Sequence, residues 1–346
     1  MKNQEPNDSF ELELVAALQP IRQLVLANCL WHLFEQGIYD ELATGPKSLD
    51  ALSKARKMDP VRLDALMTFL RNEGIIEVDE GAFQLTGAGR SYERFRPWYT
   101  MLVGGYGATF RELGPALYAG TPPVGRDADA VGVGSCGISH FGAIPLTRYL
   151  MGRSTQPCRR LLDLGCGNAL YLVEFCKTMP EIQAWGVEPS QTGYESAKRL
   201  VVDTGLAGRI ELFNAGALEF IRKDVPINPD FTVLGFVLHE ILGQAGEEGV
   251  IEFLGALTTR FPALEIIVIE VDNHFGDSKM MRHTMATAYY NSYCLLHPFT
   301  NQRLETAAYW EKLFVKCGLD IIERKSISPN ADSTGMEVGY LLRKKA

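Results

Sequence analysis

A glycine-rich turn with acids around it is the strongest chemical signal in the sequence. Residues 161–168 read LLDLGCGN, a short apolar strand that ends in a turn before an apolar helix. The glycines, Gly165 and Gly167, let a ligand lie against the backbone, where a side chain would collide with it. Asp163 precedes the turn, and Glu188 ends the next expected strand, where a carboxylate can bind both hydroxyls of a ribose. The pattern predicts a cofactor that carries a nucleoside.

The turn differs from a dinucleotide-binding loop at one position. Such a loop carries a third glycine where this chain has Leu170, so a pyrophosphate has less room here. The remaining pattern, Asp-x-Gly-x-Gly with an acid after the second strand, resembles the class I methyltransferases. The resemblance implies S-adenosylmethionine as cofactor; the alternative is an ordinary nucleotide-fold turn with another ligand. Ala215 and Gly216 stand where that class often has an acid, so we expect backbone and apolar contacts to the adenine.

Two histidines are candidates for the chemistry. His239 and Glu240 follow the fourth expected strand, on the ligand side of the sheet. Plant-type O-methyltransferases carry His-Asp there, and that resemblance implies that His239 removes a proton. His297 lies in a segment, residues 280–303, that is rich in Tyr, Met and His and that we expect to cover the cofactor. Two imidazoles can hold a metal and leave positions open for a substrate; the alternative for each histidine is a structural role.

Several residues together resemble the α-keto acid β-C-methyltransferases over nearly the whole chain. They are Trp98, GGYGATF, Gly125-Arg126-Asp127, VGVGS at 131–135, His239 and His297. The resemblance implies that the two histidines hold iron or zinc, and that Arg126 binds the carboxylate of the keto acid. The metal would stabilise the enolate, whose β-carbon then attacks the sulfonium methyl group. Such enzymes supply β-methyl amino acids for natural products such as antibiotics.

Two features limit the resemblance and leave alternatives open. Glu240 stands in place of the expected Asp, and Phe236 offers no third metal ligand. A metal-bound hydroxide, an unligated His239 or Glu240 could accept the proton. Overall resemblance favours 2-ketoarginine (5-guanidino-2-oxopentanoate) over phenylpyruvate and 4-methyl-2-oxopentanoate. Four acids could suit a guanidinium tail: Glu112, Glu240, Glu270 and Asp272. The expected substrate contacts are Arg126, Trp98, Tyr106, Tyr290 and Phe299.

The elements that must position these residues alternate from Pro157 onward between apolar strands and amphipathic helices. This alternation predicts a parallel, doubly wound α/β sheet of the class I (Rossmann-like) type, closed by a C-terminal hairpin. The preceding Gly/Pro-rich stretch, residues 104–142, predicts loops. We therefore expect a SAM-binding methyltransferase domain at 151–346 and a Gly-rich substrate-binding linker at 98–150.

The first 97 residues predict helices followed by a hairpin, the pattern of a winged helix. Residues 10–36 carry apolar side chains at spacings that suit a buried helical face, and Ser48 and Asp59 are expected caps of two further helices. The residues 59–73 mix acids with bases, so DNA binding is the weaker interpretation. The arrangement resembles the N-terminal domain of small-molecule methyltransferases, which implies a homodimer.

Length, charge and cysteine content restrict the classes of protein to which the chain can belong. The chain has 346 residues and a net charge of −8, which disfavours a general nucleic-acid binder. Seven scattered cysteines without CxxC spacing favour reduced thiols in a cytoplasm. The polar start is unlike a signal peptide, and we expect no membrane-spanning segment. The main alternative is a small-molecule O-methyltransferase with His239 as general base; a DNA-binding regulator is a third.

Overall fold

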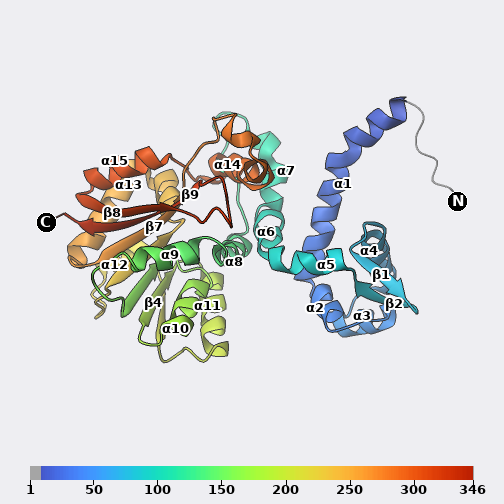
Figure 1. The fold of residues 1–346 in the computed structure, drawn as a ribbon, viewed down its shortest axis with the longest axis horizontal. Helices are drawn as coiled ribbons and strands as arrows, with labels where there is room; N and C mark the ends of the chain where they lie inside the picture. The colour runs from blue at the N-terminus through green and yellow to red at the C-terminus, as the bar shows by residue number, and fades with distance from the viewer. Residues whose placement is uncertain (1–8, 346) are drawn as a thin grey trace. The chain divides into compact units, whose positions relative to one another are not determined.

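The computed structural model describes residues 9–345. The chain divides into two compact units, the first ending at Gly104 and the second beginning at Gly105. Residues 1–8, which hold most of the polar start, lie outside the described residues. The first unit contains α1 (Ser9–Glu35), α2 (Ile38–Ala43), α3 (Leu49–Arg56), α4 (Pro60–Asn72), β1 (Ile76–Asp79), β2 (Ala82–Leu85), α5 (Gly87–Ser91), η1 (Tyr92–Phe95) and α6 (Arg96–Tyr99) (Figure 1).

The first unit has the helices and hairpin of a winged helix. Ser48 and Asp59 cap α3 and α4 by accepting hydrogen bonds from backbone N–H groups, as predicted. The strands β1 and β2 pair antiparallel, with Ile76 opposite Leu85. Their two-residue turn, Glu80-Gly81, has positive φ at both positions, which is the geometry that closes a tight hairpin.

Helix α1 differs from the prediction. Only Leu30, Leu33 and Phe34 are buried in it, at its C-terminal end. The apolar residues of its first two-thirds are solvent-exposed, with Leu24 64% exposed and Leu18 45% exposed. The expected buried face is therefore wrong for this part of the helix in a single chain. By length and composition alone, α1 could also cross a membrane, whereas the sequence led us to expect no membrane-spanning segment. Core helices of soluble proteins pass the same test.

The second unit is built on one mixed sheet of seven strands in the order β5-β4-β3-β6-β7-β9-β8. Neighbours from β5 to β7 are parallel, and β9 runs antiparallel to both β7 and β8. The predicted class I fold with its C-terminal hairpin is confirmed. The strands are β3 (Arg160–Leu164), β4 (Gln183–Glu188), β5 (Ile210–Asn214), β6 (Phe231–Gly235), β7 (Glu265–Val271), β8 (Leu319–Ser326) and β9 (Glu337–Lys344).

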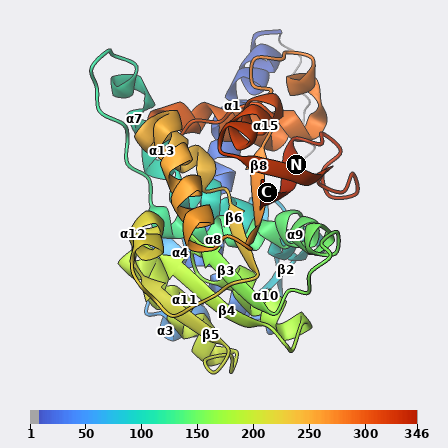
Figure 2. The same cartoon turned by 90° about the vertical axis from the view of Figure 1, so that its left-hand side faces the viewer.

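Helices cover both faces of this sheet (Figures 1 and 2). One apolar core joins the sheet to α12, α13 and α15, and the other joins it to α9, α10 and α11. Successive strand residues alternate between the two cores, as in a sheet buried on both sides. The helices are α9 (Ala143–Met151), α10 (Leu170–Thr178), α11 (Gln191–Asp203), α12 (Ala217–Arg222), α13 (Leu238–Arg260) and α15 (Ala307–Lys316).

The Gly/Pro-rich stretch is more regular than predicted. It forms η2 (Thr100–Gly105), α7 (Gly107–Ala116) and α8 (Ala128–Ser139), so the expectation of loops holds between α7 and α8 and in the turn at residues 140–142. Asp127 accepts hydrogen bonds from the backbone N–H groups of Asp129 and Ala130 and thereby caps α8. Capping and packing thus outweigh the low helix propensity of glycine in α8.

The segment after β7 is a series of short helices. They are η3 (Met280–Arg282), η4 (Ala286–Tyr290), α14 (Asn291–Leu296) and η5 (His297–Thr300). η4 is a turn of π-helix, a conformation that is rare and often found at functional sites.

Candidate active site

The glycine turn lies between β3 and α10. Gly165 has φ +85° and Gly167 has φ +54°, so both require a conformation that glycine adopts at least cost. A Cβ at Gly167 would also lie 3.2 Å from Cys136 Sγ of α8. The glycines are therefore demanded by the backbone itself, in addition to any ligand.

Glu188, at the end of β4, is tied to this turn. Its Oε2 accepts a hydrogen bond from Gly167 N at 2.8 Å, and its Oε1 accepts one from Ser190 N at 2.9 Å. Asp163 is 5% exposed; burial, and then the charge of Glu188, raise its pKa to about 7. The two acids thus lie beside the turn.

The residues at the end of β5 and just after it lie beside Glu188. Asn214 Nδ2 donates to the carbonyl of Glu188 at 2.9 Å, and Ala215 N donates to it at 3.3 Å. Gly216 then begins α12 with an extended backbone. Ala215 and Gly216 are thereby held beside Glu188.

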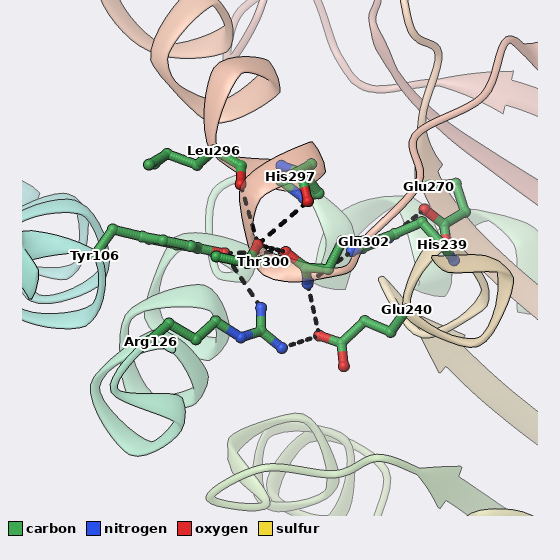
Figure 3. Close-up of polar contacts among 9 residues, drawn as sticks. All are labelled: Tyr106, Arg126, His239, Glu240, Glu270, Leu296, His297, Thr300 and Gln302. Atoms are coloured by element: carbon green, nitrogen blue, oxygen red, sulfur yellow. Dashed lines mark hydrogen bonds and ion pairs between the residues drawn. The ribbon is translucent and has the colours of Figure 1, made fainter. Parts of the chain in front are cut away.

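His239 is held by a buried carboxylate. It stands in the first turn of α13, and its Nδ1 lies 2.8 Å from Glu270 Oε2 of β7 (Figure 3). Its backbone N donates to Glu270 Oε1 at 3.1 Å, and Glu270 is fully buried. Burial lowers the pKa of His239, but Glu270 outweighs this effect and the net shift is upward. The dyad assigns the proton on Nδ1 and leaves Nε2 facing away from Glu270.

His297 lies next to His239. The ring centroids are 5.1 Å apart, and His297 Nδ1 lies 2.6 Å from the carbonyl of Tyr293, to which it donates. Burial, followed by the charge on His239, moves the pKa of His297 well below its ordinary value. His297 is therefore held as a neutral imidazole, whose Nε2 keeps a lone pair that can bind a metal. Two histidines that are 58 residues apart in the sequence are thus brought together.

Arg126 and Glu240 form an ion pair beside the histidines. Arg126 Nη2 lies 2.6 Å from Glu240 Oε1, and Arg126 Nη1 donates to the Tyr106 hydroxyl at 3.2 Å (Figure 3). Burial lowers the pKa of Arg126, but Glu240 and Tyr106 raise it by more, so the net shift is upward and the guanidinium stays charged. This cation is only partly exposed and can exchange Glu240 for the carboxylate of a small acid.

Gln302 links the ion pair to the histidines and was missed in the sequence. Its Nε2 donates to Glu240 Oε1 at 3.0 Å and lies 3.5 Å from His239 Nε2. Its Oε1 accepts from the Thr300 hydroxyl at 2.9 Å. A lone amide in a polar segment carries no sequence signal that would mark it.

The other predicted contacts are less uniform. Tyr290 is buried and donates through its hydroxyl to Asp332 Oδ2 at 2.6 Å. The carbonyl of Phe299 accepts from Val124 N at 2.7 Å, so η5 lies against the segment that carries Arg126. Trp98 belongs to the first unit and is partly buried there. The structure therefore brings together Tyr106, Arg126, His239, Glu240 and His297.

Comparison with known proteins decides the family. No protein-family model matches the chain. It is 36% identical over 344 residues to 2-ketoarginine methyltransferase of Streptomyces arginensis, covering 98% of both chains. The chain belongs to the S-adenosylmethionine-dependent α-keto acid C-methyltransferase family. It is 26% identical over 249 residues to indolepyruvate C-methyltransferase of Streptomyces griseus, covering 67% of this chain and 69% of that protein.

Solved structures agree on the fold. An O-methyltransferase family protein from Burkholderia thailandensis superposes with a TM-score of 0.64 at 15% identity, over 97% of this chain and 98% of that one. An O-methyltransferase from neocarzinostatin biosynthesis, solved with S-adenosylmethionine and a hydroxynaphthoic acid, gives a TM-score of 0.60 at 16% identity, over 94% and 98%. Together with the 36% identical relative, the fold identifies the enzyme as an S-adenosylmethionine-dependent methyltransferase.

Proposed function

We propose that the enzyme transfers a methyl group from S-adenosylmethionine to the β-carbon of an α-keto acid, and that this acid is 2-ketoarginine. The observation that carries the proposal is the partly buried Arg126 guanidinium beside the His239–His297 pair. A keto acid has one carboxylate for the guanidinium and a neighbouring keto oxygen for the histidine side of the site. The relative from Streptomyces arginensis supports the choice of substrate.

The cofactor contacts follow from the turn between β3 and α10. We propose that Glu188 binds the ribose hydroxyls, and that Gly165 and Gly167 let the amino acid part of the cofactor approach the backbone. Asp163 would lie beneath this part of the cofactor. Ala215 and Gly216 would contact the adenine through backbone and apolar atoms.

The histidine pair fits a metal ion in its donor chemistry. Both Nδ1 atoms are engaged, with Glu270 and with the Tyr293 carbonyl, so both Nε2 atoms present lone pairs. Partners of this kind commonly orient metal-binding imidazoles. No group of three or more His, Cys, Asp or Glu side chains that could hold a metal occurs among residues 9–345. We propose that His239 and His297 bind iron or zinc, which would supply Lewis-acid polarisation of the keto oxygen when bound.

Proton removal is assigned to Glu240. Its hydrogen bonds from Arg126 and Gln302 both go to Oε1, which leaves Oε2 for the substrate. The β-carbon loses a proton to this carboxylate and keeps the electron pair as an enolate. That carbon then forms a bond to the sulfonium methyl group while the carbon–sulfur bond breaks, and the sulfur retains the electrons as S-adenosylhomocysteine. The chain would hold the β-carbon, the methyl carbon and the sulfur in line, and would exclude water from the site.

The first unit carries the surface through which we propose that the protein dimerises. The exposed apolar side chains of α1 include Leu18, Ile21 and Leu24. An apolar face of this kind usually marks a protein interface. We propose that residues 1–97 form a dimerisation domain that pairs two copies through α1, and that 98–150 contribute substrate contacts, with Trp98 among them. The pathway we propose is the biosynthesis of a β-methyl amino acid for an antibiotic, in the cytoplasm.

A second candidate is O-methylation of a small hydroxy compound. The His239–Glu270 dyad favours it, because an imidazole with its Nδ1 proton held by a carboxylate is a good general base at Nε2. His297 would have no chemical role in that reaction.

One screen tests the proposed function. Purified enzyme is incubated with S-adenosylmethionine and each of 2-ketoarginine, phenylpyruvate and 4-methyl-2-oxopentanoate, and products are measured by mass spectrometry. We expect a gain of one methyl group, greatest with 2-ketoarginine. Methylation of none of the three would reject the proposed function.

A further inference from the structure

Glu337 carries a buried carboxylate without a partner. It begins β9 and is 8% exposed, and its Oε1 is buried with no hydrogen-bond partner among residues 9–345. Burial raises the pKa of this carboxyl to about 8, and repulsion from the negative charge of Asp332 contributes to the rise. Buried carboxylates in native proteins normally have a cation or several donors beside them. Among residues 9–345 no group supplies such a partner to Glu337 Oε1.

The nearby Asp332 differs from Glu337 in that its carboxylate has hydrogen-bond donors on both oxygens. Asp332 is 4% exposed, but it accepts hydrogen bonds from Tyr290 Oη at 2.6 Å, Thr334 N at 2.8 Å and Thr334 Oγ1 at 2.9 Å. The fold thus satisfies one acid of the pair completely and leaves the other open.

Glu337 stands at the edge of the sheet where ligands bind. It pairs with Val271, the last residue of β7, so it lies at the carboxyl end of the parallel strands. A Cβ at Gly142, which precedes α9, would lie 2.7 Å from Glu337 Oε1. The glycine therefore leaves the room that the carboxylate occupies on the α9 face of the sheet.

Aromatic rings connect Glu337 to the histidine pair. The Tyr293 ring centroid lies 4.1 Å from that of His297, and the Tyr289 centroid lies 5.5 Å from that of Tyr293. Burial, followed by the charge of Glu337, raises the pKa of Tyr289 and of Tyr290. The rings thus extend from His297 to two tyrosines whose pKa values respond to the charge of Glu337. Aromatic faces also attract a guanidinium.

We propose that Glu337 binds the guanidinium group at the far end of the keto acid substrate. The proposal rests on the proposed function and names the residue that selects the substrate's tail. Strand β9 is two positions from β6, which leads into His239, and two strand spacings measure about 10 Å. The five bonds from the keto carbon to the guanidinium carbon span roughly 6 Å when extended. Charge-assisted hydrogen bonds of about 2.8 Å complete the distance.

The acids that the sequence suggested for this role are engaged elsewhere or exposed. Glu240 pairs with Arg126, Glu270 pairs with His239, and Asp272 Oδ1 accepts from Ala307 N. Glu112 is exposed. Glu337 is the buried acid near the site that a cationic tail would satisfy.

The test compares two substrates of the same shape, one cationic and one neutral, that differ in a single terminal group. 2-Ketoarginine carries a guanidinium, and 2-oxo-5-ureidopentanoate carries a neutral urea of the same shape. Wild type, Glu337→Gln and the control Glu323→Gln, on the adjacent strand β8, are assayed for kcat/KM. Thermal stabilisation by each keto acid is measured in parallel. We expect wild type to prefer 2-ketoarginine at least 10-fold, and Glu337→Gln to lose roughly 10- to 100-fold on it, mainly in KM.

The outcomes separate this inference from the proposed function. A threefold or smaller change on the urea compound with Glu337→Gln, together with loss of the preference in turnover and in thermal stabilisation, supports the guanidinium site. Equal losses on both substrates, or an unchanged preference, would overturn it while the keto acid chemistry stands. Stabilisation by 2-ketoarginine that depends on Glu337, without methyl transfer, would instead reject the proposed reaction. Gly142→Ala, which crowds the carboxylate but keeps its charge, should also reduce the preference.

Discussion

Arg126 Nη2 lies 2.6 Å from Glu240 Oε1, so the cation proposed to bind the substrate and the carboxylate proposed to take its proton are in direct contact. Gln302 donates to the same oxygen of Glu240. Under the proposed function, a keto acid that enters would share the guanidinium with Glu240, and this would bring its β-carbon close to the base. Binding and proton removal would then be coupled in one ion pair.

Arg126→Lys should weaken substrate binding. Lysine keeps the charge but loses the planar fork that can hold Glu240 and a carboxylate together. We expect KM for the keto acid to rise about 10- to 100-fold, with a smaller fall in kcat. Steady-state kinetics measure both constants, and Arg222→Lys, at an exposed ion pair with Glu252, serves as the control. An unchanged KM would contradict the role of Arg126.

His297→Ala should distinguish the two candidate reactions. If both histidines bind a metal, either His239→Ala or His297→Ala lowers the metal content of the purified enzyme, which elemental analysis measures without an assay of activity. We expect keto acid methylation to fall at least 100-fold in both variants. O-methylation by His239 as base would tolerate His297→Ala, and a metal-free wild type whose activity chelators leave unchanged would exclude the metal.

Glu270→Gln should loosen His239 without touching the substrate. The amide cannot hold the Nδ1 proton as a carboxylate does, and loss of such a partner lowers metal affinity about 10- to 100-fold. We expect a competition titration with a chelator to show this weakening. The exposed Glu252→Gln is the comparison, and equal affinity in the two variants would argue against the dyad.

A site residue could be predicted from the sequence where its role depends on neighbouring residues in the chain. The turn at Gly165 and Gly167 and the acid Glu188 were visible because strand, turn and helix follow one another directly. His239 was identified by its place after β6. Gln302 and Glu337 gave no such signal, because their significance comes from burial and from partners in distant elements.

The same reason explains the errors outside the site. Glycines in α8 suggested loops, but the cap at Asp127 and the packing of the helix decide its conformation. The apolar spacing of α1 identified a helix correctly and could not say what covers it, since an interface between chains has the same pattern as a core. Domain boundaries and the dimer therefore stay predictions.

Stability should fall as the pH rises in the absence of ligand. The carboxyl of Glu337 has a pKa of about 8 in the folded chain and about 4.5 when unfolded, so above pH 4.5 the unfolded state releases a proton that the folded state keeps. The free energy of unfolding therefore falls as the pH rises from about 4.5 to about 8. Glu337→Gln should remove this part of the slope and raise Tm at pH 8 by a few degrees. Parallel Tm curves for the two proteins from pH 5 to 8 would contradict the raised pKa.

Charges placed on α1 should dissociate the proposed dimer. Leu18→Asp with Leu24→Asp puts two carboxylates on its exposed apolar face, while Val315→Asp changes an exposed apolar residue of α15. We expect sedimentation analysis to find wild type and Val315→Asp as dimers and the α1 variant as a monomer. A monomeric wild type would show that α1 is covered in another way.

The most direct test of the central claim is where the methyl group arrives. Enzyme is supplied with S-adenosylmethionine labelled with 13C in its methyl group and with 2-ketoarginine labelled with 13C at the β-carbon, and the product is examined by NMR. The account predicts a one-bond 13C–13C coupling between the two labels. A methyl signal without that coupling, or no transfer to the keto acid, would contradict it.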